Sequence, residues 1–132
     1  MDCFSYKNSS LFCEDVNLQD IANEYGTPTY VYSRRTLEQN IDLYQQSFKN
    51  KNSLICFSVK SLNNLAILKI LNDKECGFDI VSGGELHRVI LAGADPKKII
   101  FSGVGSQEPK WPHGLIIIFF HSILNLSQNL IG

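Results

Sequence analysis

Hydrophobic residues recur along most of this chain in two alternating patterns. Stretches with apolar side chains at every second position predict β-strands, and stretches with apolar side chains three or four positions apart predict helices. A short strand or hairpin is expected within residues 1–13. Helices are expected at 20–25, 34–48, 64–74 and 83–93, and strands at 29–33, 54–60, 77–82 and 98–102.

Local signals support several of these boundaries. Asn63 or Asn64, and then Ser82, are expected to cap the helices that follow them, because their side chains can accept hydrogen bonds from first-turn amides. Gly93 is expected to end the helix 83–93. Strands that lie about 20–25 residues apart and alternate with helices form parallel βαβ units. The sequence therefore predicts an α/β fold in which roughly half of an eightfold barrel is present.

Composition and charge exclude some partners and sites. The net charge of the 132 residues is −1, so neither nucleic acid nor an anionic membrane is an expected partner. The longest apolar run, Leu115 to Phe120, is far shorter than the ~20 residues of a membrane span. The four cysteines show no Cys-x-x-Cys pair or histidine spacing that predicts a metal site. With no signal peptide at the N-terminus, we expect a soluble, cytoplasmic protein with reduced thiols.

The strand expected at 54–60 contains the first candidate for chemistry. With period two, Cys56, Ser58 and Lys60 share one face, so two small residues precede an amine at the strand's last position. Barrels of βα units place their chemistry at the carboxyl ends of the strands. A lysine there can form a Schiff base with a carbonyl once its pKa is lowered. On these residues alone, a solvated lysine that ends an ordinary strand is the simpler interpretation.

Four motifs then place this strand in a wider pattern. In order along the chain they span Tyr25–Tyr32, Ile55–Leu68, Gly77–Leu86 and Ile99–Gly105. Together they closely resemble the diaminopimelate decarboxylases, which belong to the pyridoxal-phosphate decarboxylases with an alanine-racemase-like barrel. The resemblance implies a TIM-like (β/α)8 barrel that binds pyridoxal 5'-phosphate, here truncated after about half its length.

The resemblance also implies roles for two residues. Lys60 would hold pyridoxal 5'-phosphate through its amine, and Asp79 would line the cofactor site near that lysine, where opposite charges within ~4–6 Å favour an ionised pair. Without the resemblance, a structural carboxylate with satisfied hydrogen bonds explains Asp79 equally well. The family usually reads Tyr-Ala-Val-Lys-Ala-Asn around the lysine. This chain departs from that motif at Phe57, Ser58, Ser61 and Leu62.

Two further features lie after the aspartate. Gly83 and Gly84 open the expected helix 83–93, whose first amides could bind an anion. Close packing explains a glycine pair equally well, and in the family the phosphate is held mainly by later glycine-rich segments, so we expect packing. His87 is expected to be a surface or packing residue rather than a catalytic one.

The last part of the chain departs from the family pattern. Residues 106–132 predict neither a clear helix nor a barrel strand. His121 to Gly132 can be encoded by a message whose shifted frame reads Phe-Asn-Ile-Glu-Ser-Glu-Pro-Glu-Leu-Asp-Trp, close to the family's next strand. We therefore expect 106–132 to be an aberrant, frameshifted tail, from a mutation or a sequencing error, and the chain as written to be inactive.

The expected function follows from the resemblance. The family converts meso-2,6-diaminopimelate to L-lysine and carbon dioxide, the last step of lysine biosynthesis, and its full-length members are expected to be homodimers that act on a small amino-acid substrate. Residues 1–28 would be the segment that packs on the family's β-domain, and 29–105 the partial barrel. Two alternatives stay open: another decarboxylase of this fold, acting on ornithine, arginine or carboxynorspermidine, and a non-catalytic cofactor-binding barrel protein.

Overall fold

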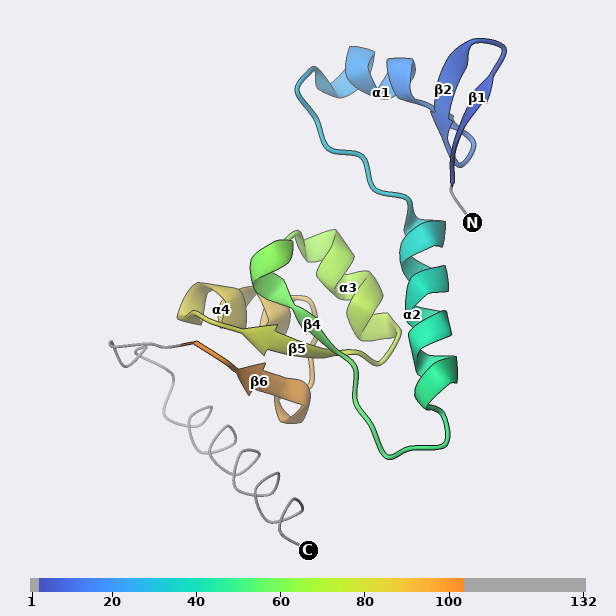
Figure 1. Ribbon diagram of the computed structural model, residues 1–132. Coiled ribbons are helices and arrows are strands. Elements are labelled where there is room, and N and C mark those ends of the chain that lie inside the picture. The colour runs from blue at the N-terminus through green and yellow to red at the C-terminus, as the bar shows by residue number, and fades with distance from the viewer. Residues whose placement is uncertain (1–2, 104–132) are drawn as a thin grey trace, which may run out of the picture. The chain divides into compact units, whose positions relative to one another are not determined.

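The computed structural model describes residues 3–103 of the chain (Figure 1). The chain divides into two compact units, Met1–Asn50 and Lys51–Gly132. The predicted tail at 106–132 lies outside the described residues, and the predicted divisions after residues 28 and 105 stay predictions. None of the helices among residues 3–103 combines the length and the apolar character that a membrane crossing requires.

The first unit begins with three short antiparallel strands. Strand β1 (Phe4–Lys7) pairs with β2 (Ser10–Cys13), which also pairs with β3 (Val16–Asn17). Between β1 and β2, Asn8 and Ser9 adopt positive φ angles of 49° and 65°, as in the two-residue turns whose twist matches that of the flanking strands. The hairpin predicted within 1–13 is confirmed.

Two helices follow in this unit, and the sequence predicted both. The Asn17 side chain caps α1 (Leu18–Tyr25), and the Ser33 side chain caps α2 (Arg34–Phe48) by accepting a hydrogen bond from the Thr36 amide. Glu14 connects the strands to the start of α2, because its Oε1 accepts hydrogen bonds from the Arg35 amide and the Ser33 hydroxyl, both at 2.8 Å. These bonds hold the pKa of Glu14 below its ordinary value.

The strand predicted at 29–33 is wrong. These residues have the β-branched and aromatic side chains that favour strands, but a strand also needs a neighbour to share its ladder of hydrogen bonds. No strand among residues 3–103 pairs with this segment. Tyr30 and Tyr32 instead stack on each other, with ring centroids 6.5 Å apart.

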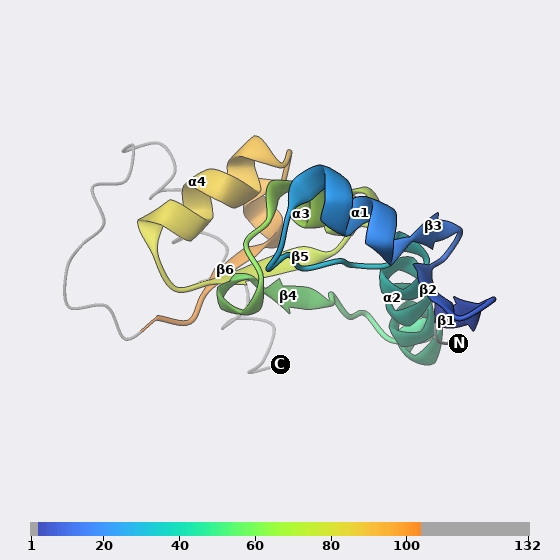
Figure 2. The same ribbon diagram turned by 90° about the horizontal axis from the view of Figure 1, so that it is seen from above.

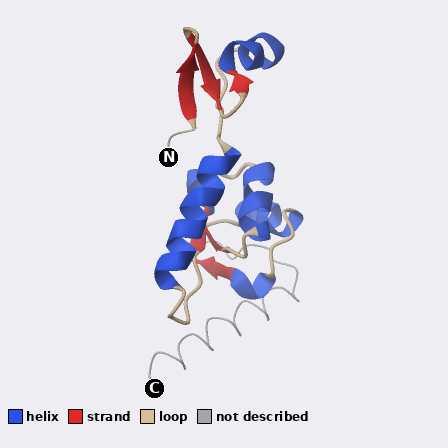
Figure 3. Cartoon of the chain, turned by 90° about the vertical axis from the view of Figure 1, so that its right-hand side faces the viewer, coloured by secondary structure: helices blue, strands red, loops and turns tan. Residues whose placement is uncertain are grey.

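Between residues 51 and 103, the second unit contains a parallel three-stranded sheet with helical connections (Figure 3). Its strands lie in the order β4 (Cys56–Ser58), β5 (Gly77–Ile80) and β6 (Ile99–Phe101). Helix α3 (Leu65–Asp73) connects β4 to β5, and α4 (Gly83–Leu91) connects β5 toward β6. Two short 3-10 helices also lie in this part of the chain, η1 (Val59–Ser61) after β4 and η2 (Pro96–Lys98) before β6. The predicted parallel βαβ units are confirmed.

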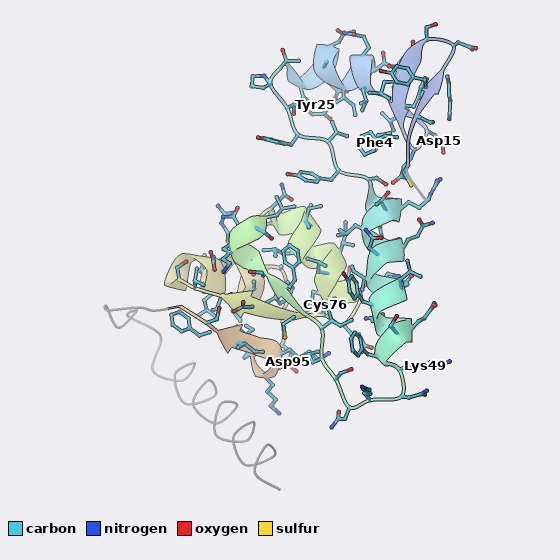
Figure 4. All side chains as sticks on the ribbon, in the orientation of Figure 1. Phe4, Asp15, Tyr25, Lys49, Cys76 and Asp95 are labelled. Atoms are coloured by element: carbon cyan, nitrogen blue, oxygen red, sulfur yellow. The ribbon has the colours of Figure 1, made fainter. Side chains whose placement is uncertain are left out.

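The helix caps of this unit match the predicted residues. Asn64 accepts hydrogen bonds from the amides of Ala66 and Ile67, and Ser82 accepts one from the amide of Glu85. Cys76 and Asp95, both labelled in Figure 4, mark the amino ends of β5 and of the η2–β6 segment. Asp95 accepts a hydrogen bond from the Lys97 amide and so caps η2.

The core of the unit lies on one face of the sheet. Helices α3 and α4 contact each other and lie on this face, as Figure 2 shows. The sheet contributes Phe78 and Ile80, whose side chains are completely buried, and Ile99. Leu68 of α3 and Val89 of α4 are also completely buried. Burial of side chains this large contributes roughly 1.5–3 kcal/mol each, so this face holds the unit together.

The opposite face, which we call the open face, carries Cys56, Ser58, Asp79 and Ile100. Ser58, Asp79 and Ile100 occupy one row across the sheet, because Asp79 is the register partner of both other residues. Among residues 51–103, no α-helix lies on this face. The open face is therefore where the described part of this unit leaves room for a ligand.

Candidate functional site

Lys60 lies in a tight turn just beyond the carboxyl end of β4. The sequence predicted a strand that continues to residue 60, but β4 ends at Ser58 and Lys60 is the middle residue of η1. Two hydrogen bonds close the turn: the Leu62 amide donates to the Val59 carbonyl at 3.1 Å, and the Ser61 hydroxyl donates to the Ser58 carbonyl at 2.7 Å. The strand prediction missed the turn because side-chain hydrogen bonds of this local kind compete with strand pairing.

The Lys60 side chain is accessible. It is exposed, and within residues 3–103 its amine makes no hydrogen bond or ion pair. Its neighbour Val59 is completely buried and anchors the backbone just before the lysine. An amine on a fixed backbone at the carboxyl end of a parallel strand is well placed to react with a carbonyl group.

Asp79 lies on the adjacent strand, two positions from Lys60 by register. Its Cα pairs with that of Ser58, which precedes Lys60 by two residues. The side chain is half-buried, and its Oδ1 is buried without a hydrogen-bond donor among the described residues. Because a buried acceptor without a donor is costly, this oxygen indicates a donor that comes from elsewhere, such as a bound molecule or the lysine amine.

Cys56 shares the open face with Asp79. Burial and, second, the negative charge of Asp79 raise the pKa of the Cys56 thiol. The thiol is therefore neutral, and Cys56 lines the site as a small side chain rather than as a nucleophile. Period-two alternation had already placed this residue on the lysine-bearing face.

The junction between β5 and α4 is fixed by a pair of local hydrogen bonds. Glu85 Oε2 accepts from the Val81 amide at 2.7 Å, and Ser82 Oγ accepts from the Glu85 amide at 3.2 Å. This arrangement resembles a capping box and sets the direction in which the chain leaves Asp79. The packing explanation for the glycine pair is wrong at Gly84, where an added Cβ would meet only Ser82 Oγ, at 3.9 Å. His87 is exposed.

The residues of the open face and the neighbouring lysine turn suit a cofactor with a reactive carbonyl. Within residues 3–103, Lys60 supplies an amine without a partner and Asp79 supplies an acceptor without a donor. The small side chains of Cys56 and Ser58 leave space on the open face. Among residues 3–103, no group of three or more His, Cys, Asp or Glu side chains is placed to hold a metal ion. Pyridoxal 5'-phosphate, held through Lys60, fits this set.

Comparisons with known proteins identify the family of the chain. The sequence model of the family described as "Pyridoxal-dependent decarboxylase, pyridoxal binding domain" matches residues 34–110. Diaminopimelate decarboxylase of Haemophilus influenzae is 49% identical over 107 residues, which cover 81% of this chain and 26% of the relative. The enzyme of Pseudomonas aeruginosa with the same name is 50% identical over 105 residues, which cover 80% of this chain and 25% of the relative.

A solved structure shows the same fold. The crystal structure of diaminopimelate decarboxylase from M. jannaschii in co-complex with L-lysine matches with a TM-score of 0.76 and 30% identity. The match covers 92% of this chain and 28% of that one. This chain thus spans about a quarter of the length of its relatives, which confirms the prediction of a partial barrel. The chain belongs to the pyridoxal-dependent decarboxylases and contains part of their pyridoxal-binding domain.

Proposed function

We propose that this chain is the amino-terminal part of a diaminopimelate decarboxylase, which converts meso-2,6-diaminopimelate to L-lysine and carbon dioxide. One observation carries the proposal: Lys60, whose amine has no partner within residues 3–103, follows β4 at its carboxyl end. Asp79, whose Oδ1 lacks a donor in the same part of the chain, is paired on β5 with Ser58, two residues before that lysine. The relatives that are 49–50% identical have the name of this enzyme, and a structural relative is described as a complex with L-lysine.

Lys60 and Asp79 have distinct roles in this proposal. The Lys60 amine would hold pyridoxal 5'-phosphate. Once bound, the cofactor supplies an electron sink for the breaking of the bond to the carboxylate. Asp79 would accept a hydrogen bond from a donor on the open face, because its Oδ1 lacks one among residues 3–103. Val59, completely buried, keeps the turn that carries the lysine in place.

The 132 residues by themselves are proposed to release no carbon dioxide. Strands β4 and β6 are the outer strands of the described sheet, and each has only one neighbour. Only three described strands therefore line the site, too few to enclose a substrate away from water. In the complete protein, the remaining part would close the barrel, and we propose that two such chains form a homodimer.

A trapping experiment tests the cofactor part of the proposal. The chain is incubated with pyridoxal 5'-phosphate and reduced with borohydride, and the modified lysines are identified by mass spectrometry. We expect the pyridoxyl group on Lys60 in preference to Lys69, an exposed lysine of α3 paired with Asp73. The Lys60→Arg variant should lose the preferential label, and the Lys69→Arg variant should keep it. Equal labelling of both lysines would refute the role of Lys60.

A chimera tests the reaction. Residues 1–103 replace the matching segment of the Haemophilus influenzae relative, and carbon dioxide release is measured with meso-diaminopimelate, ornithine and arginine. We expect release from meso-diaminopimelate alone, and its loss in the Lys60→Ala chimera. Release from ornithine or arginine instead would favour a different decarboxylase of this family. No release from any substrate by a folded chimera that holds the cofactor would favour a binding protein.

A further inference from the structure

The turn that carries Lys60 is closed by a side chain as well as by the backbone. The Ser61 hydroxyl donates to the Ser58 carbonyl at 2.7 Å, so this bond forms a ring that contains Lys60. The bond is shorter than the neighbouring backbone bond, in which the Leu62 amide donates to the Val59 carbonyl at 3.1 Å. A hydroxyl that bonds back to a carbonyl three residues earlier restricts the backbone between them.

This restriction matters because nothing else within residues 3–103 directs the lysine side chain. The Lys60 amine has no hydrogen bond or ion pair there, and the side chain is exposed. Where its amine can reach is therefore set mainly by the backbone direction at Lys60. The backbone is anchored before the lysine by the buried side chain of Val59 and after it by the Ser61 hydroxyl.

The side chains of the neighbouring residues Ser58 and Leu62 do not close this turn in place of Ser61. Leu62, the next residue, has an apolar side chain that cannot donate or accept a hydrogen bond. The hydroxyl of Ser58 makes no capping bond to η1, so only its main-chain carbonyl takes part. Ser61 thus provides the one side-chain hydrogen bond that closes η1 among the described residues.

We propose that Ser61 is a positioning residue for Lys60. By holding the Ser58–Ser61 turn closed, its hydroxyl directs the lysine amine toward the open face of the sheet, where the cofactor carbonyl is received. This inference rests on the proposed function, since it assigns a second residue to the same site. Alanine at position 61 leaves the amine present but allows it a wider range of directions, and threonine preserves the hydroxyl.

The test uses the complete 132-residue chain and four proteins: wild type, Ser61→Ala, Ser61→Thr and Ser47→Ala. Ser47 is a matched control, because its exposed hydroxyl also donates to a backbone carbonyl, that of Leu43, at 2.8 Å, but on α2 of the other unit. The first measurement is the exchange rate of the Leu62 amide by NMR. Loss of a neutral hydrogen bond predicts exchange about fivefold faster in Ser61→Ala, with Ser61→Thr and Ser47→Ala unchanged. The Phe78 amide in β5 reports general unfolding and should be unchanged in all four.

The second measurement is borohydride trapping of pyridoxal 5'-phosphate at Lys60, relative to Lys69. We expect the ratio to fall about fivefold in Ser61→Ala and to be restored in Ser61→Thr. Unchanged Leu62 exchange in Ser61→Ala would overturn the inference, and so would faster exchange with an undiminished trapping ratio. A wild-type chain that labels Lys60 no better than Lys69 would overturn the proposed function and this inference together. A wild-type preference that Ser61→Ala retains would overturn the inference alone.

Discussion

The two faces of the sheet in the second unit differ in burial and in chemistry. On the helix-covered face, Phe78 and Ile80 are completely buried and Ile99 is 3% exposed. On the open face, Ile100 is 38% exposed and Asp79 is half-buried with an unsatisfied oxygen. Neighbours along one strand, such as Phe78 and Asp79, therefore belong to different environments.

This difference shows how a short sheet can combine stability with a site. Because side chains alternate along a strand, every second residue can be committed to packing while the residues between them stay available for a ligand. Polar and charged groups can then occupy the open face without interrupting the core. The comparison makes a clear prediction: substitutions on the helix-covered face should change stability, and those on the open face should change the site.

The largest expected effect is that of Phe78→Ala. Removing a completely buried aromatic ring should lower the free energy of unfolding by about 3–5 kcal/mol. Urea unfolding followed by far-UV circular dichroism measures the loss. Tyr30→Ala is the control, because that aromatic side chain is 88% exposed and should contribute little. Equal losses from both variants would mean that Phe78 does not hold the core of the unit.

The next effect compares two isoleucines that are adjacent in β6. Ile99→Ala should cost about 2–5 kcal/mol, because the side chain is buried under the helices. Ile100→Ala should cost about 1 kcal/mol, because much of its side chain is already in contact with water. Urea unfolding of the two variants measures how much free energy of unfolding each one loses. If Ile100→Ala were the more destabilising variant, the assignment of the two faces would be reversed.

The sequence predicted the helix caps and the order of strands and helices in the second unit. The caps at Asn64 and Ser82, and the alternation of strands and helices, depend on neighbouring residues and could be inferred from the chain alone. The strand at 29–33 could not be judged in this way, because pairing depends on a partner distant in sequence.

The lysine turn shows a different limit of sequence reasoning. The alternation of side chains predicted that Lys60 lies on a strand, but the Ser61 hydroxyl replaces strand pairing by a tight turn. The signal for this turn was present as two serines where the family motif has alanine. Its meaning depends on which carbonyl the hydroxyl reaches, and this contact is visible only in the folded structure. The roles of Lys60 and Asp79 came from the resemblance and stay proposals.

A smaller effect is expected from substitutions at two glycines, Gly77 at the start of β5 and Gly84 in the first turn of α4. An added Cβ at Gly77 would lie 2.6 Å from the Lys98 carbonyl oxygen and 2.7 Å from Cys56 Sγ, so backbone atoms would have to move. Gly77→Ala should therefore cost about 1–3 kcal/mol. Gly84→Ala meets only Ser82 Oγ at 3.9 Å and should be stabilising by roughly 0.5–1 kcal/mol, because alanine is the better helix former. Thermal unfolding of both variants checks the opposite signs, and a stable Gly77→Ala would contradict the close approach of the strands.

The smallest expected effect concerns the open face and its pH dependence. Burial and then the charge of Asp79 raise the pKa of the Cys56 thiol, so Asp79→Asn should lower that pKa while burial keeps it above its ordinary value. Alkylation of the Cys56 peptide, followed by mass spectrometry across a pH series, should then begin at lower pH. Asp73→Asn, an exposed aspartate of α3, is the control and should leave the profile unchanged.

The same thiol has a consequence for stability. Because the pKa of the Cys56 thiol is raised in the folded chain, this group contributes to the free energy of unfolding. The contribution is fully present below the ordinary thiol pKa and is lost as the pH rises through the raised pKa. Asp79→Asn should make that alkaline loss smaller, since the folded and unfolded pKa values move closer together. Urea titrations at neutral and alkaline pH measure the difference. An alkylation profile and an alkaline loss that are both identical in Asp79→Asn and wild type would place the carboxylate away from the thiol, and the two residues would no longer define one face.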